Sequence, residues 1–184
     1  AFEDVDIAIC WHPSNFAGVQ RETSLANCRI DFTFTGRSSH AAASPELGRS
    51  ALDAVELMNV GVNYLREHMH QECRIHYALL DAGGISPNVV QAHAKVRYVV
   101  RAPELAGLFS LIERVKKVAE GAALMTETKM EHKILSGVSN LIVNTPLMDV
   151  MQDVWQSMGP PDYDREDIAF AEAIRATLSK EDIA

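Results

Sequence analysis

The residue with the clearest chemical potential in this sequence is His40, which stands in residues 36–53, GRSSHAAASPELGRSALD. Its imidazole can donate or accept a hydrogen bond near neutral pH. The neighbouring serines and alanines are small enough for another backbone or a substrate to approach closely. We expect His40 in a strand-to-helix connection near a helix N-terminus, where free N–H groups favour anionic ligands. The alternative is a loop histidine that hydrogen-bonds to its own backbone.

A second chemically capable pair, Cys10 and His12, stands in residues 4–13, DVDIAICWHP. This run reads as a short strand stopped by a proline, and alternation places both side chains on one side of it. It is therefore geometrically possible for Cys10 and His12 to bind one metal ion as a Cys-x-His pair. Two ligands make no complete site, and the alternative is a buried structural cysteine beside a loop histidine.

The elements around His40 follow from the hydrophobic pattern. Apolar and polar residues alternate over residues 28–34, which predicts a strand with one wet face that ends at Gly36. Ser44 is the expected N-cap of a helix and Pro45 its first residue. Apolar residues then recur every three or four positions, so this helix has one apolar face.

The rest of the chain completes a compact plan. The pattern predicts two more strands, a helix, a fourth strand and two last helices, over residues 74–81, 92–101, 103–122, 126–134, 145–158 and 164–178. The order strand, helix, strand, strand, helix, strand is that of a ferredoxin-like split βαβ sandwich. We therefore predict the α+β class, with a four-stranded antiparallel sheet, both helices on one face of it, and extra C-terminal helices.

Two more polar residues stand at strand ends in this plan. Asn88 precedes the third strand and Arg101 lies at its far end. His40 and Asn88 share one edge of the sheet and should be neighbours, whereas Arg101 lies a strand length away. One small molecule cannot touch all three from a single copy of the chain. The alternatives are a turn role for Asn88 and an ion pair with Glu104 for Arg101.

The composition narrows the classes of function. The chain has 184 residues, 47% of them hydrophobic and 23% charged, as in an ordinary globular protein. Its net charge of -8 argues against a nucleic-acid or anionic-membrane surface, since both need clustered Lys and Arg. Three widely spaced cysteines suit reduced thiols, so we expect a cytoplasmic location. The chain begins without Met inside a predicted strand, and we expect it to be a fragment.

Four motifs in fixed order carry a resemblance to a known family. GRSSHAAASPELGRSALDA, GGISPNVVQ and VRYVVRAPE resemble the lid, or dimerisation, domain of the zinc-dependent aminoacylase and glutamate carboxypeptidase family of metallopeptidases. DIAICWHPS resembles the stretch of its amidohydrolase branch that supplies a metal-binding histidine just before the lid. The resemblance implies that residues 1–24 end a catalytic-domain segment, residues 25–135 form the lid, and residues 136–184 are a helical return toward the catalytic domain.

The resemblance also implies a role for each candidate residue. It makes His40 the catalytic residue that stabilises the oxyanion of the scissile amide in the partner subunit's active site. It makes Asn88 a substrate-binding residue in that same partner site, and Arg101 the residue that binds the substrate carboxylate. His12 would be one ligand of a divalent pair, two Zn or Mn ions in the full-length enzyme. The other metal ligands and the general base lie outside this chain.

The function implied is that of a fragment of a metal-dependent amidohydrolase acting on an N-acyl amino acid, in first place p-aminobenzoyl-glutamate. We expect a homodimer joined through the edge of the second strand. A second, different subunit of a hetero-oligomeric hydrolase is a further possible partner. The fragment alone is expected to be inactive. The alternative is a non-catalytic ferredoxin-like dimerisation or amino-acid-sensing module.

Overall fold

The computed structural model describes residues 3–14 and 16–183. Its contacts separate two compact units, one of Glu22–Val143 and one of Ala1–Arg21 with Asn144–Ala184. The first unit holds every described strand and the two longest helices. Its elements are β1 (Ala26–Thr35), η1 (Pro45–Leu47), α1 (Ala51–Arg66), β2 (Arg74–Asp81), β3 (His93–Ala102), α2 (Leu105–Thr126) and β4 (Lys129–Val138).

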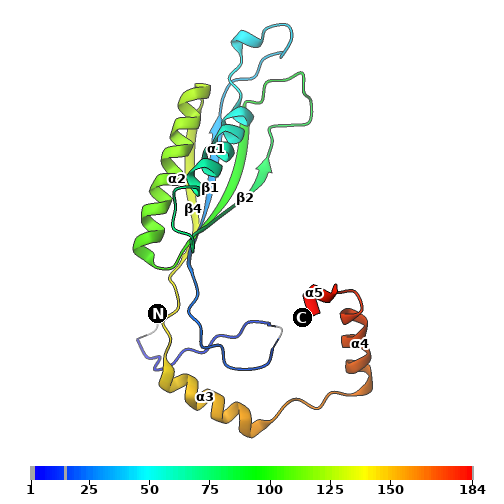
Figure 1. Cartoon of the computed structure of the whole chain (residues 1–184). Coiled ribbons are helices and arrows are strands. Elements are labelled where there is room, and N and C mark those ends of the chain that lie inside the picture. Colours follow the sequence, from blue (N-terminus) through cyan, green and yellow to red (C-terminus); the bar gives the residue numbers. More distant parts are fainter. Residues whose placement is uncertain (1–2, 15, 184) are drawn as a thin grey trace. The chain divides into compact units, whose positions relative to one another are not determined.

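The four strands form one antiparallel sheet in the order β2-β3-β1-β4. Helices α1 and α2 lie side by side on the same face of this sheet, and the other face carries no helix of the unit (Figure 1). This arrangement confirms the predicted α+β, ferredoxin-like fold. The face without a helix, here called the open face, is formed by alternate residues of each strand.

The core lies between the sheet and the two helices. From β1 it receives Cys28, Ile30, Phe32 and Phe34, each at most 4% exposed, as the alternating pattern predicts. Tyr98 of β3 is completely buried and donates its hydroxyl hydrogen to Asn59 Oδ1 of α1 at 2.5 Å. Burial of each large side chain stabilises the fold by about 1.5–3 kcal/mol, so this single layer of side chains holds the first unit together.

One carboxylate is buried on the open face. Asp31 is 3% exposed, and it accepts hydrogen bonds from Arg97 Nε at 2.6 Å and Arg97 Nη2 at 3.1 Å. Lys95 Nζ lies 2.8 Å from its Oδ2. The hydrogen bond from Arg97 is the main cause that lowers the pKa of Asp31 to about 2, against the opposing effect of burial, and Lys95 adds to it.

The first helix begins later than predicted. Pro45 opens only a short 3-10 turn, Ser44 makes no side-chain capping bond, and α1 starts at Ala51 with Ser50 as its N-cap. The Ser50 hydroxyl accepts a hydrogen bond from the Asp53 N–H at 3.1 Å. The prediction of a helix from Pro45 is wrong because the backbone of residue 49 pairs with that of residue 37 and is therefore extended.

The predicted bounds of the second half also shift. The last residue of helix α2 is Thr126. Glu127 caps the helix with a left-handed backbone of φ 53°. Strand β4 therefore starts at Lys129 rather than at residue 126, and it runs to Val138 rather than to residue 134. The prediction of a strand over residues 4–13 is wrong: none of these residues is in a strand, and an alternating pattern forms a strand only where a partner strand satisfies its backbone.

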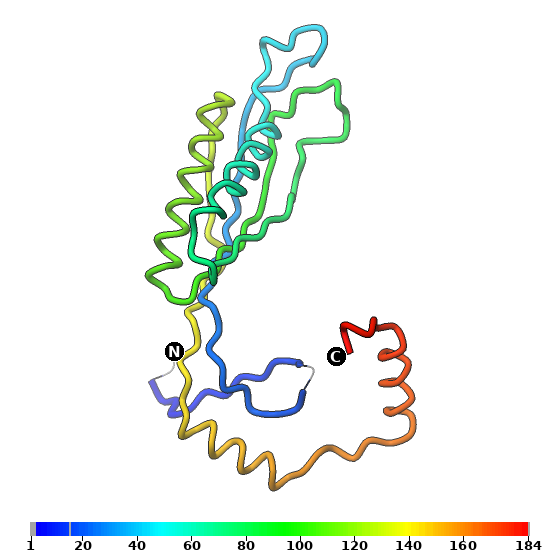
Figure 2. Tube along the Cα trace, in the orientation of Figure 1, coloured from blue at the N-terminus to red at the C-terminus, as the bar shows by residue number. Residues whose placement is uncertain are grey.

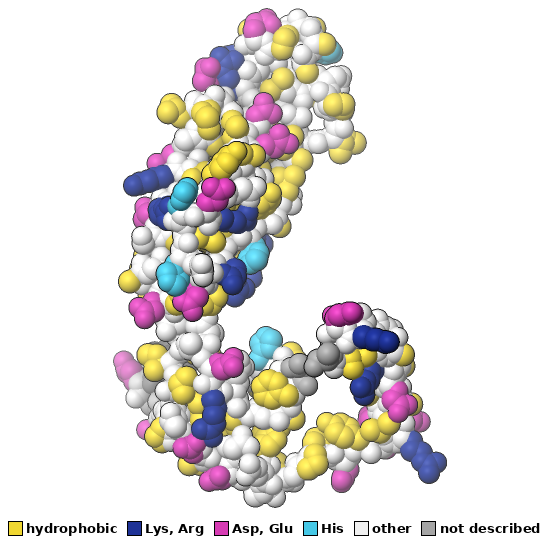
Figure 3. Space-filling model, viewed as in Figure 1, with side chains coloured by type: hydrophobic (Ala, Val, Ile, Leu, Met, Phe, Trp, Pro, Cys, Tyr) yellow, Lys and Arg dark blue, Asp and Glu magenta, His cyan; other side chains and the backbone are white. Residues whose placement is uncertain are grey.

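The second unit is helical in its C-terminal part, whereas its described residues before 22 form no helix. It contains α3 (Thr145–Met158), α4 (Arg165–Arg175) and α5 (Lys180–Ile183), none of which has a buried residue. The predicted span 145–158 is confirmed, whereas the last predicted helix ends at Arg175 and not at residue 178. Large hydrophobic side chains, Val154 and Trp155 among them, are exposed on α3, and hydrophobic side chains reach the surface along these helices (Figure 3). Within the described residues no helix has both the length and the apolar content to cross a bilayer.

Candidate functional site

His40 and Asn88 lie together at one end of the sheet. The backbone of His40 forms an isolated antiparallel bridge with Val89, and the Ala41 N–H donates to the Asn88 carbonyl oxygen at 2.9 Å. The loop from β1 to α1 and the loop from β2 to β3 rise side by side from that end (Figure 2). The structure thus brings together two of the residues that the sequence pattern predicted to be neighbours.

Glycines set the shape of both loops. A Cβ on Gly36 would lie 1.9 Å from the Arg49 carbonyl oxygen, so only glycine lets the loop close where Arg37 pairs with Arg49. Gly83 has φ 83°, a conformation that L side chains rarely adopt, and a Cβ there would meet the His93 carbonyl oxygen at 2.3 Å. These two close approaches hold the loops that carry His40 and Asn88.

The imidazole of His40 is exposed and fixed through one nitrogen. Its Nδ1 accepts hydrogen bonds from the backbone N–H groups of Ala42 at 3.2 Å and Ala43 at 3.0 Å. An accepting Nδ1 places the proton of the neutral ring on Nε2. The alternative of a loop histidine bonded to its own backbone is therefore realised, and it leaves an Nε2–H donor facing outward.

Asn88 has a turn role and a free side chain. Val89 N–H donates to the Ser86 carbonyl oxygen at 3.2 Å, which places Pro87 and Asn88 at the centre of a turn. The Asn88 carboxamide makes no hydrogen bond to any residue that the structure describes, so it is available to a ligand.

Asp81 stands at the start of this loop, and two hydrogen bonds lower the pKa of its carboxyl group. The larger effect comes from the Gly83 N–H and the smaller one from the His93 ring.

A shallow polar hollow of about 400 Å³ lies beside the His40 loop. Arg49 Nε lies 3.0 Å from Glu127 Oε2 across it. The hollow is lined by Thr35, Gly36, Arg37, Arg49, Glu127 and Lys129. Sequence reasoning missed this group because its members come from three separate stretches that only the fold joins.

Arg101 lies at the opposite end of β3. Its cross-strand neighbours are Asn27 of β1 and Arg74 of β2. Its guanidinium is exposed and has no ion-pair partner among the described residues, so the alternative ion pair with Glu104 is not formed. The eight residue steps from His93 to Arg101 span about 26 Å at about 3.3 Å each, which separates Arg101 from the His40 end.

His12 belongs to the other unit and is exposed. Its Nδ1 lies 2.8 Å from the carbonyl oxygen of Pro13, which only accepts, so Nδ1 is the donor and the Nε2 lone pair is free. This is the form of histidine that binds a metal ion, and His12 fits a single ligand. Across residues 3–14 and 16–183 no three His, Cys, Asp or Glu side chains gather into a metal site. Cys10 is exposed, so its interpretation as a buried core cysteine is wrong.

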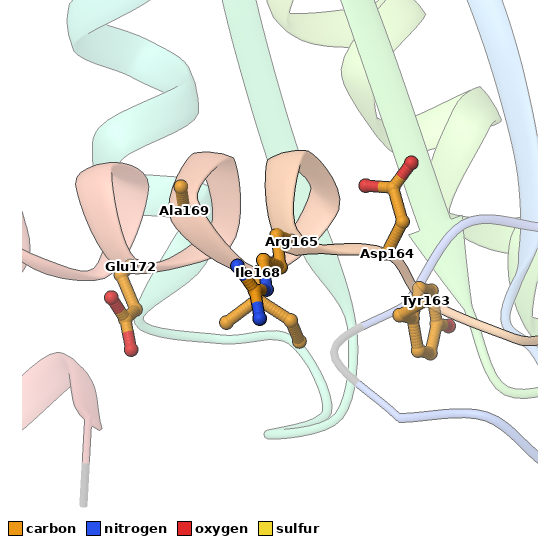
Figure 4. A pocket seen from close by; sticks show the side chains of 6 residues that line it. All are labelled: Tyr163, Asp164, Arg165, Ile168, Ala169 and Glu172. Atoms are coloured by element: carbon orange, nitrogen blue, oxygen red, sulfur yellow. The ribbon is translucent and has the colours of Figure 1, made fainter.

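A second hollow, of about 270 Å³, lies on the surface of α4 and the residues before it. Figure 4 shows that its side chains, from Tyr163 to Glu172, project from a single stretch of chain. Since one short segment supplies every wall, the hollow does not bring together groups from different elements. We do not count it as a functional site.

Comparison with known proteins gives a consistent relationship. The family described as Peptidase dimerisation domain matches residues 22–126. A p-aminobenzoyl-glutamate hydrolase subunit from Escherichia coli is 48% identical over 181 residues, which cover 98% of this chain and 38% of that protein. The Xaa-Arg dipeptidase of Mus musculus is 32% identical over 126 residues, or 68% of this chain and 29% of that protein.

Solved structures show the same fold. The aminobenzoyl-glutamate utilization protein from Klebsiella pneumoniae has a TM-score of 0.60 and 25% sequence identity, over 70% of this chain and 33% of that chain. A hydantoinase/carbamoylase family amidase from Burkholderia ambifaria has a TM-score of 0.64 over 79% of this chain and 36% of that chain, and its 12% identity supports the fold alone. The chain thus spans between 29% and 38% of the length of these four proteins.

The matched residues include every element from β1 to α2, and with them His40, Asn88 and Arg101. The 48% identity extends beyond that domain to nearly the whole chain. The chain therefore belongs to the peptidase dimerisation domain family.

Proposed function

We propose that this chain is the lid-bearing part of a metal-dependent amidohydrolase that cleaves an N-acyl amino acid, in first place p-aminobenzoyl-glutamate. The products would be p-aminobenzoate and glutamate. The observation that carries the proposal is the separation of functional groups along one sheet: an N–H donor and a free carboxamide at one end, and an unpaired guanidinium at the other. The name of the 48% identical relative supports the substrate.

In this proposal His40 acts as an oxyanion donor. Two backbone N–H groups hold its Nδ1, so the ring presents Nε2–H in a fixed direction without reorganising. A fixed donor of this kind stabilises the charge that develops on the amide oxygen and contributes about 10²–10³-fold in kcat. The Asn88 carboxamide, on the adjoining loop, would orient the same substrate.

Arg101 binds the carboxylate of the amino-acid product half. A guanidinium fork matches a carboxylate with two parallel hydrogen bonds. Because Arg101 is exposed and unpaired among the described residues, no existing ion pair would have to break. Binding of the substrate carboxylate in the ground state mainly lowers KM.

The two ends of the sheet would serve two active sites in a dimer. One substrate cannot reach both His40 and Arg101 of one copy, since a strand length separates them. In a two-fold dimer each site would combine Arg101 of one subunit with His40 and Asn88 of the other. The edge strand β2 is the proposed junction, and Tyr77 and Leu79 are 43% and 48% exposed on it.

His12 would supply one ligand of the metal centre. Its free Nε2 has the chemistry of a Zn or Mn ligand, and the remaining ligands and the general base would come from the rest of the protein. Two such ions, when bound, supply a polarised amide carbonyl and an activated water. The chain by itself should therefore hydrolyse no amide, and measurable turnover by these 184 residues would refute that.

The decisive experiment measures hydrolysis of p-aminobenzoyl-glutamate by the full-length protein with added Zn²⁺ or Mn²⁺. His40→Ala should lower kcat, Arg101→Ala should raise KM, and His68→Ala, an exposed histidine just after α1, should change neither. Mixing the His40→Ala and Arg101→Ala proteins should restore activity, because each mixed dimer contains one intact site. If mixing restores nothing, the shared-site arrangement is wrong. If His40→Ala keeps full kcat, the non-catalytic dimerisation or sensing module is the better description.

A further inference from the structure

Arg101 and two arginines of the adjacent strands, Arg74 and Arg29, lie together on the open face. Arg74 of β2 lies directly opposite Arg101 of β3 in the ladder. Arg29 of β1 lies opposite Val99 and is thus diagonal to Arg101 on the same face. Directly opposite residues have Cβ atoms about 4.5–5.5 Å apart and diagonal ones about 7–8 Å, so three long guanidinium side chains can reach one ligand. All three side chains are exposed.

None of the three is neutralised by an acid that the structure describes. Arg74 donates through Nη1 to the carbonyl oxygens of Gln71 and Cys73, the latter at 2.7 Å, which fixes its position but leaves its charge. Glu72, the nearest acid to it along the chain, lies 3.6 Å from His70 Nδ1 instead. Arg29 and Arg101 have no ion-pair or hydrogen-bond partner within the described residues.

The neighbouring cations on the same face differ from these arginines because they have an acidic partner within the fold. Lys95 and Arg97 both contact the carboxylate of Asp31, which satisfies them within the fold. Around Arg101 the positions on the same face are Asn27, Val99 and His76, none of which is an acid. Like charges directly opposite each other in a sheet are destabilising, so the Arg74–Arg101 pair lowers the stability of the lid. An arrangement that costs stability and has no internal counter-ion fits an anionic ligand.

We propose that Arg29, Arg74 and Arg101 form one binding surface, here called the arginine triad, that selects ligands carrying two carboxylates over otherwise equal ligands carrying one. The inference rests on the proposed function in one respect. It takes the amino-acid half of the proposed substrate as the ligand and assigns contacts to a second carboxylate of it. Arg101 binds the main-chain carboxylate of the amino-acid half. Arg74 and Arg29 bind the side-chain carboxylate, as in a glutamyl group.

The preference for two carboxylates follows from a comparison with a ligand in which one carboxylate is replaced by a neutral group. A glutaminyl group has the same length as a glutamyl group but a neutral carboxamide end. Its NH₂ group would face donors only, since a guanidinium has no acceptor. The charged ligand would instead gain hydrogen bonds to an ionised group, which are stronger than neutral ones.

The test is a binding titration of this chain, followed by NMR, with N-acetyl-L-glutamate and with N-acetyl-L-glutamine at constant ionic strength. We expect the dicarboxylate to bind about three- to tenfold more tightly, with shifts in residues of β1, β2 and β3 around the triad. Arg29→Gln and Arg74→Gln should each remove most of that preference, whereas Arg74→Lys should retain part of it. Lys133→Gln is the matched control, because Lys133 is an exposed cation on the same face beyond Asp31.

The outcomes separate this inference from the proposed function. Equal affinity for the two ligands, no saturable shift with either, or loss of preference in Lys133→Gln would each overturn the arginine triad. The titration involves no hydrolysis, so it does not depend on metal or on the rest of the protein. If the titration shows the preference but the full-length protein does not cleave p-aminobenzoyl-glutamate, the triad stands and the proposed reaction falls.

Discussion

The backbone N–H of Ala41 donates to the carbonyl oxygen of Asn88 at 2.9 Å, and this bond joins the two loops at one end of the sheet. A second bond, from the Val90 N–H to the Ser39 carbonyl oxygen at 2.9 Å, lies on the other side of His40. Because His40 is bracketed by both bonds, its position depends on the β2–β3 loop as much as on its own. A change that moves one loop should therefore move both candidate groups.

Gly36→Ala tests this dependence. The new Cβ would lie 1.9 Å from the Arg49 carbonyl oxygen, so the loop that carries His40 must shift. We expect a loss of about 1–3 kcal/mol in the free energy of unfolding and a lower kcat in the full-length protein. Urea denaturation of this chain measures the first effect, and the proposed amide hydrolysis, assayed with the full-length protein, measures the second.

Gly121→Ala is the control for that experiment. Gly121 lies within α2, and a Cβ there would meet nothing within 4 Å. Alanine in a helix interior is more stable than glycine by about 0.5–1 kcal/mol, so this variant should be slightly stabilised. An unchanged stability and activity in Gly36→Ala would show that the loop closure does not hold His40.

Ser50→Ala tests where the first helix begins. The Ser50 hydroxyl caps α1 by accepting from the Asp53 N–H at 3.1 Å, and removing it should cost about 1 kcal/mol of stability. Ser44→Ala should have no such effect, because Ser44 makes no side-chain capping bond. Thermal unfolding of both variants gives the answer. An equal loss in Ser44→Ala would restore the helix start that the Ser-Pro pattern predicted.

Local pattern was sufficient for most elements of the fold. The alternation over residues 74–81 and the Thr-Pro start of α3 both predicted bounds that the structure reproduces. In each case the signal is contained within the segment itself. The start of α1 was missed because residue 49 pairs with residue 37, a contact across a loop that no local window contains.

The candidate site was predictable in part for the same reason. The connection order alone placed His40 beside Asn88, since both loops must leave the same end of the sheet. The proton position on His40 and the hydrogen bonds that fix it depend on the loop conformation, which the sequence pattern does not determine. The grouping of Arg29 and Arg74 with Arg101 depends on strand register, and alternation could have indicated only that they share a face.

The buried carboxylate of Asp31 predicts a pH dependence of stability. Its pKa is about 2 in the folded protein, held down chiefly by the Arg97 hydrogen bond, against about 3.9 in an unfolded chain. Because the folded value is the lower one, the stabilisation is complete above about pH 4 and is lost as pH falls toward 2. This difference in pKa corresponds to about 2–3 kcal/mol of stability at neutral pH.

Urea denaturation between about pH 2 and pH 7 measures this contribution. Asp31→Asn should lower the stability at neutral pH and flatten the dependence in the acid range, since the carboxylate no longer titrates. Arg97→Gln removes the main partner and should flatten it partly, with Lys95 remaining 2.8 Å from the carboxylate. A wild-type slope in Asp31→Asn would mean that another group is responsible for the acid sensitivity.

The edge of β2 predicts the site of dimer formation. Strand β2 ends the sheet, and its Tyr77 and Leu79 side chains are 43% and 48% exposed although they point to the helix side. On α1, Val60 and Tyr64 are 49% and 64% exposed. A paired strand edge flanked by these apolar groups would bury them against a second copy, as is typical of two-fold interfaces.

Leu79→Glu would place a charge in that contact, so light scattering should report a monomer for this variant and a dimer for the wild type. Leu124→Glu, at a position 81% exposed on α2, should remain a dimer. A dimeric Leu79→Glu protein would show that the interface lies elsewhere than at β2, and a monomeric wild type would contradict the dimer itself.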